Sequence, residues 1–405
     1  MRILIISFYY PPDLSAGSFR TGALVEQLRK RLKPSDTIRI VTTQPNRYAS
    51  FRAAAHVLEV SDCVSIERIQ LPSHSSRFSD QSRAFLRFAR ETMRRCRGER
   101  CDLVFATSSR LMTAALGVEV ARRTGAASYL DIRDLLTDTL EDLLKGPTRA
   151  LVPLIRLVER WTFRRADQVN IVSPGFAEYV MRIRGSRDLS VHTNGVDPEF
   201  LDGDFDGPPN DPPVILYAGN IGEGQGLDQI VPAAALLLAR RYRFRIIGDG
   251  GGREKLERAL QAIGDAAGSV ELRPPVSREE LRRNYRAADV LFLHLNAYQA
   301  FEKVIPSKIF EYAATGKPVL AGIRGTSREF VKRHVTNARC FDPCDAPGLA
   351  RALEELKLGL TDRSGFSREF ARDVIMARMA DEIVACAASR EFRRRHSLAL
   401  PTAPC

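Results

Sequence analysis

The feature that most constrains the fold is a segment rich in proline, glycine and aspartate near the middle of the chain, residues 201–213 (LDGDFDGPPNDPP). Proline and glycine interrupt helices and strands, so we interpret this segment as a linker. On both sides of it, short apolar strands alternate with helices of 3.6-residue periodicity. Because parallel strands need a crossover that a helix usually supplies, this alternation predicts two α/β domains with parallel sheets that face a cleft.

The domain boundaries follow from this alternation of strands and helices. A length of 405 residues is consistent with two hydrophobic cores. The expected strands of the first domain lie at 2–7, 38–42, 103–106, 128–132 and 168–172, and those of the second at 214–218, 244–247, 270–273, 290–294, from Pro318 and at 338–341. We therefore predict a first domain at 1–198, a linker at 199–213, a second domain at 214–366, a long helix at 367–389 that crosses back to the first domain, and a basic, disordered tail at 390–405.

Composition excludes several classes of protein. The hydrophobic content of 44% and charged content of 27% are globular values. No apolar run reaches the ~18 residues of a membrane span. The N-terminus has no signal peptide pattern, which favours a cytoplasmic protein. The seven cysteines are scattered without a second pair at zinc-ligand spacing, so we expect reduced thiols and no metal site.

The net charge of +12 is concentrated in the first half of the chain. Residues 1–195 hold 31 Lys/Arg and 20 Asp/Glu, a balance of +11, whereas residues 196–405 hold 30 and 29, a balance of +1. Nucleic acid, an anionic membrane surface or a phosphorylated substrate could each explain a basic first half. No nucleic-acid recognition fold is visible, so we expect no nucleic-acid partner.

Two basic helices contribute to this charge. In 75–100, Phe78, Phe85 and Phe88 mix with seven arginines between 77 and 97. In 147–165, apolar residues that include Trp161 recur at helical spacing among five arginines. Both helices could lie on a membrane surface, or pack on the sheet with solvated arginines. We favour the membrane surface for 75–100, where charges break the apolar stripe, and packing on the sheet for 147–165.

The most informative stretch is 301–322 (FEKVIPSKIFEYAATGKPVLAG). It predicts a helix that Ser307 caps and a strand that begins at Pro318. Lys308 stands in the first turn, where a cation is locally unfavourable, and a bound phosphate would explain it. Glu311 lies one turn along on the same face, where its carboxylate could accept hydrogen bonds from sugar hydroxyls. The alternative is a solvated surface pair.

Two glycine-rich loops, 219–226 and 248–252, each follow a strand and open a helix. Their backbone N–H groups could hold phosphates, or the loops could be tight turns alone. Neither loop is a dinucleotide fingerprint or a P-loop. In the first half, the 15–18 loop and the charged run 131–134 (DIRD) also follow strands, where α/β proteins place their ligands.

The order of motifs is more specific than any one motif. It comprises PP-x-x-SAG-x-x-R at 11–20, VSPGFAEY at 172–179, NGVD at 194–197, YAGN at 217–220, IGDG at 247–250, AADV at 287–290 and PSKIFEYAATGKPV at 306–319. This series resembles the retaining glycosyltransferases of family 4, which have the GT-B fold of two Rossmann-like domains. The sequences GNIGEGQGLD, DIRDL and PSKIFEY resemble the branch that builds bacterial O-antigen and capsular polysaccharides on a lipid carrier.

The resemblance implies a binding site for a nucleotide sugar. Glu311 corresponds to the glutamate that binds the ribose hydroxyls, and backbone N–H groups from Ser307 to Ile309 would meet the diphosphate. The Gly17 loop would approach the same phosphates from across the cleft. The nucleoside would be bordered by Gly248, Asp249, Gly250 and Val276.

The chain departs from the family pattern at several positions. Family members usually carry a first glutamate where this chain has Lys303, and Glu302 misses that position by one residue. Many members carry an arginine and a lysine where Asn220 and Gln225 stand, just before Gly226, and these cations neutralise the departing diphosphate. Lys308 is our candidate replacement, Lys303 the second, and Arg20 could help from the first domain.

The resemblance also implies a mechanism. A nucleotide sugar, UDP-linked by preference, would donate its sugar with retention and without a metal or other cofactor. The departing phosphate would take the proton of the incoming hydroxyl. Asp131 or Asp134 would orient the acceptor, a polyprenyl-diphosphate-linked or saccharide molecule, and Arg133 would contact its phosphate. The basic first domain would then lie on the inner membrane surface. The alternatives are a GT-B epimerase or hydrolase and a non-catalytic subunit that binds a sugar nucleotide.

Overall fold

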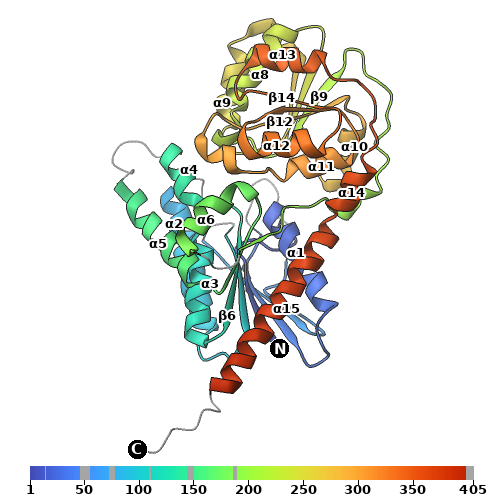
Figure 1. Cartoon of the computed structure of the whole chain (residues 1–405). Coiled ribbons are helices and arrows are strands. Elements are labelled where there is room, and N and C mark those ends of the chain that lie inside the picture. The colour runs from blue at the N-terminus through green and yellow to red at the C-terminus, as the bar shows by residue number, and fades with distance from the viewer. Residues whose placement is uncertain are drawn as a thin grey trace, which may run out of the picture. The chain divides into compact units, whose positions relative to one another are not determined.

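The computed structural model describes residues 1–13, 15–45, 55–72, 78–108, 111–143, 150–185 and 189–397. The chain forms two compact units (Figure 1). Unit 1 comprises 1–193 together with the C-terminal segment from residue 373, and unit 2 comprises 194–372. Within the described ranges, no helix has the length and apolar character needed to cross a membrane.

Unit 1 is built on an eight-stranded sheet with the order β3-β4-β2-β1-β5-β6-β7-β8. All its strand pairs are parallel except β3–β4. The strands are β1 (Arg2–Ile6), β2 (Thr37–Thr43), β3 (Leu58–Ser61), β4 (Val64–Ile69), β5 (Leu103–Thr107), β6 (Ala127–Ile132), β7 (Gln168–Ile171) and β8 (Leu189–Val191). β5 and β6 are buried along their whole length, which explains their continuous apolar runs.

The helices of unit 1 connect these strands, apart from the C-terminal helix, which follows the last strand of the chain. They are α1 (Ala16–Arg29), α2 (Phe78–Arg95), α3 (Leu111–Thr124), α4 (Leu136–Leu143), α5 (Val152–Arg165), α6 (Ala177–Arg184) and, beyond its first residue, α15 (Arg372–Ser397). Ser15 caps α1, because its hydroxyl accepts the Ser18 N–H at 3.1 Å. This cap fixes the turn between β1 and α1.

Unit 2 has a six-stranded, fully parallel sheet with the order β11-β10-β9-β12-β13-β14. Its strands are β9 (Val214–Ala218), β10 (Arg243–Ile247), β11 (Val270–Arg273), β12 (Val290–His294), β13 (Val319–Gly322) and β14 (Ala338–Phe341). Its helices are α7 (Pro198–Leu201), α8 (Leu227–Leu238), α9 (Arg253–Gln261), α10 (Arg278–Arg286), α11 (Lys308–Ala314), α12 (Gly325–His334), α13 (Ala346–Glu354) and α14 (Ser364–Glu369). The predicted fold class, α/β with two parallel-sheet domains, is confirmed.

The segment predicted as a linker belongs to unit 2. Asn210 holds it in place, because its side-chain amide donates to Asp289 at 2.8 Å and to the Ala287 carbonyl at 2.9 Å. The unit boundary lies at residues 193 and 194, not in the proline-rich run. A Pro/Gly pattern predicts irregular backbone but does not show whether side chains tie that backbone to a neighbouring sheet.

The C-terminal helix α15 packs within unit 1 through Met376, Met379 and Ile383, which are buried. Arg31, two residues after the end of α1, donates to Asp381 of α15 at 2.6 Å. The helix continues to Ser397, so the tail predicted from residue 390 is helical at its start, and 398–405 lie outside the described residues.

The two basic helices differ from the preferences stated above. In α2, Phe88 is buried and packs edge-on against Phe8, with ring centroids 5.2 Å apart. In α5, Leu154 and Leu157 are 60% and 64% exposed. The helix with the broken apolar stripe therefore packs on unit 1, and the helix with the better stripe leaves its leucines exposed. The side chain of Phe78 lies outside the described residues.

Candidate functional site

The site in unit 2 is built around the short helix α11. Its Ile309, Phe310, Tyr312 and Ala313 are buried. The Tyr312 hydroxyl accepts the Ala218 N–H at 3.1 Å, which fastens α11 to the carboxyl end of β9. In parallel α/β sheets, ligands bind beyond these strand ends. The helix therefore presents its remaining polar residues, Lys308 and Glu311, next to that edge.

Glu311 is a buried carboxylate with three partners. Its side chain is 8% exposed. Oε2 accepts from Nζ of Lys308 at 2.8 Å and from the Tyr285 hydroxyl at 3.1 Å, and Oε1 lies 3.5 Å from Nη1 of Arg278. Burial opposes ionisation, but the charges of Lys308 and Arg278 outweigh it, so the pKa of Glu311 lies below its ordinary value. The group is an ionised acceptor at neutral pH.

The buried carboxylate of Glu311 therefore explains why Lys308 is tolerated in the first turn of α11. The ammonium of Lys308 neutralises Glu311 and also donates to the Tyr285 hydroxyl at 3.2 Å. The pair is not the solvated surface pair of the alternative interpretation, since both side chains are largely covered. The phosphate invoked to explain this cation is not needed for that purpose.

The predicted helix cap is wrong. Ser307 makes no side-chain cap bond and has helical backbone angles. The Ile309 N–H donates to the Pro306 carbonyl at 3.1 Å. This N–H is occupied within the turn, which gives the predicted diphosphate contact at Ile309 no support.

Arg278 was not predicted as a site residue from the sequence, although it connects the NGVD motif at 194–197 with Glu311 of the 306–319 motif. Its guanidinium donates to Asp197 Oδ2 at 2.7 Å and to Glu199 Oε1 at 2.8 Å, and lies 4.9 Å from the centre of the Phe200 ring. Burial opposes ionisation of Asp197, but Arg372 and Arg278 lower its pKa. The aspartate of NGVD thus holds the arginine that faces Glu311. A signal existed, because Arg278 is also a cation in the first turn of a helix, directly after the capping residue Ser277.

The two glycine loops of unit 2 lie against each other. A Cβ on Gly248 would fall 1.8 Å from the Gly219 carbonyl oxygen, and one on Gly250 would fall 2.5 Å from the Ile221 carbonyl oxygen. The Ile221 N–H donates to the Asp249 carbonyl at 2.9 Å, and the Gly252 N–H donates back to Ile221 at 2.8 Å. Glycine is required here for close backbone approach, as the tight-turn alternative expected.

Asn220 and Gln225, where the family resemblance led us to expect cations, are hydrogen-bonded to each other. The Asn220 amide donates to Gln225 Oε1 at 2.9 Å, and the same oxygen accepts the Gly222 N–H at 3.1 Å. Gly226 follows with φ +57°, and a Cβ there would lie 3.1 Å from the Asn296 side chain. Two neutral amides thus shape the loop where two cations were expected to neutralise phosphate.

The remaining residues predicted to bind the donor lie in three separate segments of unit 2. Asp249 accepts the Gly250 N–H at 2.8 Å, half-buried Val276 lies two residues before Arg278, and Lys303 ends the short 3-10 helix Gln299–Lys303. Their donor contacts stay predictions.

In unit 1, Arg20 and Asp131 form an ion pair with both side chains 2% exposed. Arg20 donates to Asp131 through Nε at 2.8 Å and Nη2 at 3.0 Å, and to the Thr193 and His192 carbonyls. Asn170 also donates to Asp131 at 2.7 Å. This corrects the sequence-based assignment, which treated both residues as available to substrate. The contacts of these two charged groups connect α1 with β6, β7 and the segment after β8.

The other predicted residues of unit 1 are placed differently. Asp134 is exposed after the end of β6, and Arg133 is half-buried, with its N–H donating to the Ser108 hydroxyl at 2.8 Å. Gly17 is buried in the first turn of α1. Of the predicted acceptor-side residues, Asp134 and Arg133 stay predictions, at a strand end where substrates bind in such sheets.

Two parallel α/β units, with a buried ionised carboxylate beyond the strand ends of the second, define a protein of the GT-B class. Comparisons with known proteins agree. Residues 19–195 match the glycosyl transferase 4-like domain, and residues 204–368 match the glycosyl transferases group 1. The chain belongs to the GT-B glycosyltransferases of the family 4 type.

One curated relative and two solved structures of similar fold show how far the likeness extends. WcaI of Escherichia coli K12, named as a glycosyl transferase of colanic acid biosynthesis, is 27% identical over 404 residues, which cover 92% of this chain and 95% of WcaI. The structure of Anabaena HepE with UDP superposes with a TM-score of 0.64 at 14% identity and covers 95% of this chain and 100% of its own. The structure of WaaG, a glycosyltransferase of lipopolysaccharide biosynthesis, gives a TM-score of 0.60 at 14% identity and covers 94% and 95%.

Proposed function

We propose that this glycosyltransferase moves a hexosyl group from a nucleotide sugar, UDP-linked by preference, to a lipid-linked or saccharide acceptor in surface polysaccharide synthesis. The observation that carries the proposal is the ionised, almost fully buried carboxylate of Glu311, held by Lys308, Tyr285 and Arg278. A fixed acceptor of this kind suits a diol such as the two ribose hydroxyls of a nucleotide. Burial of this charge costs desolvation energy, which its pairing with Lys308 and Arg278 offsets.

The donor would bind with its ribose on Glu311. Oε2 already accepts two hydrogen bonds, so the ribose hydroxyls would donate to Oε1, which has only the longer contact to Arg278. Lys308 has a third ammonium hydrogen beyond its bonds to Glu311 and Tyr285, and this hydrogen could meet a diphosphate oxygen. The binding of UDP by HepE supports UDP as the nucleotide.

The transfer would proceed with retention and without a metal ion. As the glycosidic bond breaks, negative charge grows on the leaving diphosphate, and Lys308 would stabilise it, with Lys303 as the second candidate. The same phosphate would accept the proton of the incoming hydroxyl, so no separate base is required. Asp134 and Arg133, after β6 of unit 1, would bind the acceptor and its phosphate.

The acceptor class rests on the relatives. WcaI is named for colanic acid biosynthesis and WaaG for lipopolysaccharide biosynthesis. These names support a lipid-linked or saccharide acceptor, which the basic unit 1 would meet at an anionic membrane surface on the cytoplasmic side.

The experiment has a binding arm and a transfer arm. UDP and a panel of UDP-sugars should raise the melting temperature of the wild type but not of Glu311→Gln, whereas Glu279→Gln, an exposed glutamate on α10, should behave as wild type. Incubation with the binding sugar nucleotide, membrane extract and EDTA should release UDP and label a lipid-linked product whose anomeric configuration matches the donor. Free sugar released without acceptor would indicate a hydrolase or epimerase. Binding without turnover would indicate a non-catalytic subunit.

A further inference from the structure

Helix α5 leaves two of its leucines exposed on the outer face of unit 1. Leu154 and Leu157 are 60% and 64% exposed, while Glu159 and Thr162 on the opposite face are buried. Amphipathic helices of globular proteins normally show the reverse arrangement. Exposed apolar side chains that gather on one face of a helix are typical of a surface that meets a partner.

The orientation of α5 is fixed by contacts on its inner face. The buried Glu159 carboxylate accepts hydrogen bonds from the Tyr179 hydroxyl of α6 and, at 3.5 Å, from the Thr137 N–H of α4. Phe163, fully buried, packs on the same side. Rotation of the helix to bury Leu154 and Leu157 would break these bonds and expose Phe163. The outward face is therefore a property of the folded unit.

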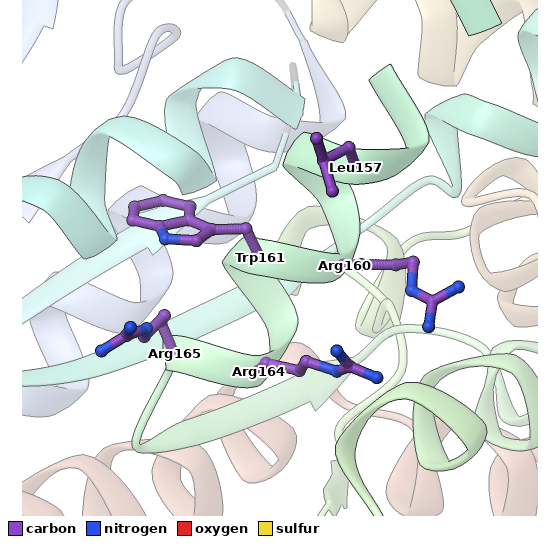
Figure 2. A pocket seen from close by; sticks show the side chains of 5 residues that line it. All are labelled: Leu157, Arg160, Trp161, Arg164 and Arg165. Carbon is purple, nitrogen blue, oxygen red and sulfur yellow. The ribbon is translucent and has the colours of Figure 1, made fainter. Parts of the chain in front are cut away.

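The exposed face combines apolar and cationic groups. A pocket of about 280 Å³ is lined by Leu157, Arg160, Trp161, Arg164 and Arg165. Figure 2 shows the Trp161 indole between Leu157 and Arg165, with Arg160 and Arg164 projecting on the other side of the helix. The pocket lining contains three arginines and no carboxylate. Arg160, Arg164 and Arg165 are exposed, and Nε of Arg164 donates to the Ile183 carbonyl at 3.3 Å.

We propose that this face, Leu154, Leu157, Arg160, Trp161, Arg164 and Arg165, docks the protein on an anionic lipid surface. The leucines and the indole would enter the boundary between headgroups and acyl chains, and the arginines would reach the headgroup phosphates. The charge of the face is complementary to anionic lipid, and its apolar centre distinguishes it from a site for a free phosphate or a nucleic acid backbone. The proposal deepens the lipid-linked acceptor proposed above and uses no residue of the donor site.

The single tryptophan of the sequence makes this surface directly observable, since all indole fluorescence of the chain comes from Trp161. Titration with vesicles of phosphatidylcholine and phosphatidylglycerol should shift the emission to shorter wavelength and increase it, as the indole leaves water. Pure phosphatidylcholine vesicles should give a much weaker response, and salt should reverse the binding. Flotation with the same vesicles should recover the protein with the lipid.

Matched variants locate the surface. Arg160→Gln/Arg164→Gln/Arg165→Gln should weaken vesicle binding by about fivefold for each arginine, or about 100-fold in all. The control removes three exposed arginines from the other basic helix, Arg83→Gln/Arg87→Gln/Arg90→Gln in α2, and should weaken binding much less. Leu154→Gln/Leu157→Gln keeps the charge and should reduce the emission shift.

Three results would overturn the proposal. The first is vesicle binding that is lost in the α2 variant but kept in the α5 variant. The second is no response of the wild type to anionic vesicles at low salt. The third is an emission shift that depends on protein concentration without lipid, which would indicate that a second copy of the chain covers this face. The UDP-induced rise in melting temperature is measured on every variant. Because that rise depends on unit 2, failed docking with intact UDP stabilisation refutes the docking surface alone, and loss of UDP stabilisation in the wild type refutes the donor proposal alone.

Discussion

The ammonium of Lys308 lies 2.8 Å from Oε2 of Glu311, and the carboxylate is almost fully buried. This one contact joins the two residues at the centre of the proposed donor site of unit 2. Lys308 therefore has two roles in the proposed reaction: it positions Glu311, and it stabilises the leaving diphosphate.

Replacing Lys308 separates these two tasks. We expect Lys308→Ala to lower kcat by about 10²-fold or more, because a charge that stabilises the leaving group is lost. If Lys308 only positions Glu311, the KM for the donor will rise and kcat will stay near the wild-type value. Steady-state kinetics decide between these outcomes, and Lys303→Ala, the second candidate, should have the smaller effect on kcat.

Arg278 should affect donor binding rather than chemistry. Arg278→Gln removes the cation that faces Oε1 of Glu311, so we expect the KM for the donor to rise about 10-fold with little change in kcat. Arg278→Lys should restore part of the loss. The control is Arg283→Gln on the same helix, which breaks only an exposed pair with Glu279. An unchanged KM in Arg278→Gln would contradict the positioning role.

Asp131 should contribute to the stability of unit 1 rather than to acceptor binding. Asp131→Asn leaves the guanidinium of Arg20 buried without its counter-charge, and we expect a loss of about 3–5 kcal/mol in the free energy of unfolding. Asp134→Asn, at an exposed position three residues on, should leave stability near wild type. Urea unfolding measures both. A stable Asp131→Asn protein that has lost only acceptor binding would restore the acceptor role predicted from the sequence.

Gly248 should tolerate no side chain. A Cβ would lie 1.8 Å from the Gly219 carbonyl oxygen, so Gly248→Ala must push the two glycine loops apart, and we expect a cost of about 2–4 kcal/mol in stability. Gly251→Ala, three residues along the same turn, meets nothing within 4 Å and is the matched control. Equal melting temperatures for the two variants would show that the loops separate freely.

His294 should make unit 2 sensitive to acid. Nε2 accepts the Cys344 N–H at 2.9 Å and Nδ1 lies 2.6 Å from the Gln225 carbonyl, which fixes the neutral imidazole, and burial lowers its pKa to about 4. The unfolded chain takes up this proton near pH 6.5, so the stabilising contribution is present above that pH and is lost as pH falls toward 4. We expect about 2 kcal/mol to be lost between pH 7.5 and pH 5. His294→Gln should lose less over that range in urea unfolding. An equal loss in both proteins would assign the acid sensitivity to other groups.

Much of the fold could be read from local patterns. The parallel sheets follow from buried apolar runs that alternate with helices, and the spacing of Lys308 and Glu311 follows from one helical turn. The partners of Glu311 could not be read in the same way. Arg278 and Tyr285 come from α10, and only the packing of that helix on α11 brings them to the carboxylate.

The orientation of the basic helices illustrates the same limit. The periodicity of 147–165 shows an apolar stripe but not its direction, because direction depends on what lies behind the helix. In α5 that is a buried hydrogen-bonded glutamate, Glu159, together with Phe163. In α2 the aromatic side of the helix finds Phe8.

The sequence by itself determined the class of fold, the order of motifs, and the two residues at the centre of the proposed donor site, because these depend on spacing along the chain. The tertiary structure alone decided that Glu311 is buried and ionised, that Arg20 and Asp131 neutralise each other, and that α5 presents its leucines to solvent. These properties depend on burial and on the distance between charges from remote segments, and both are set only when the chain packs.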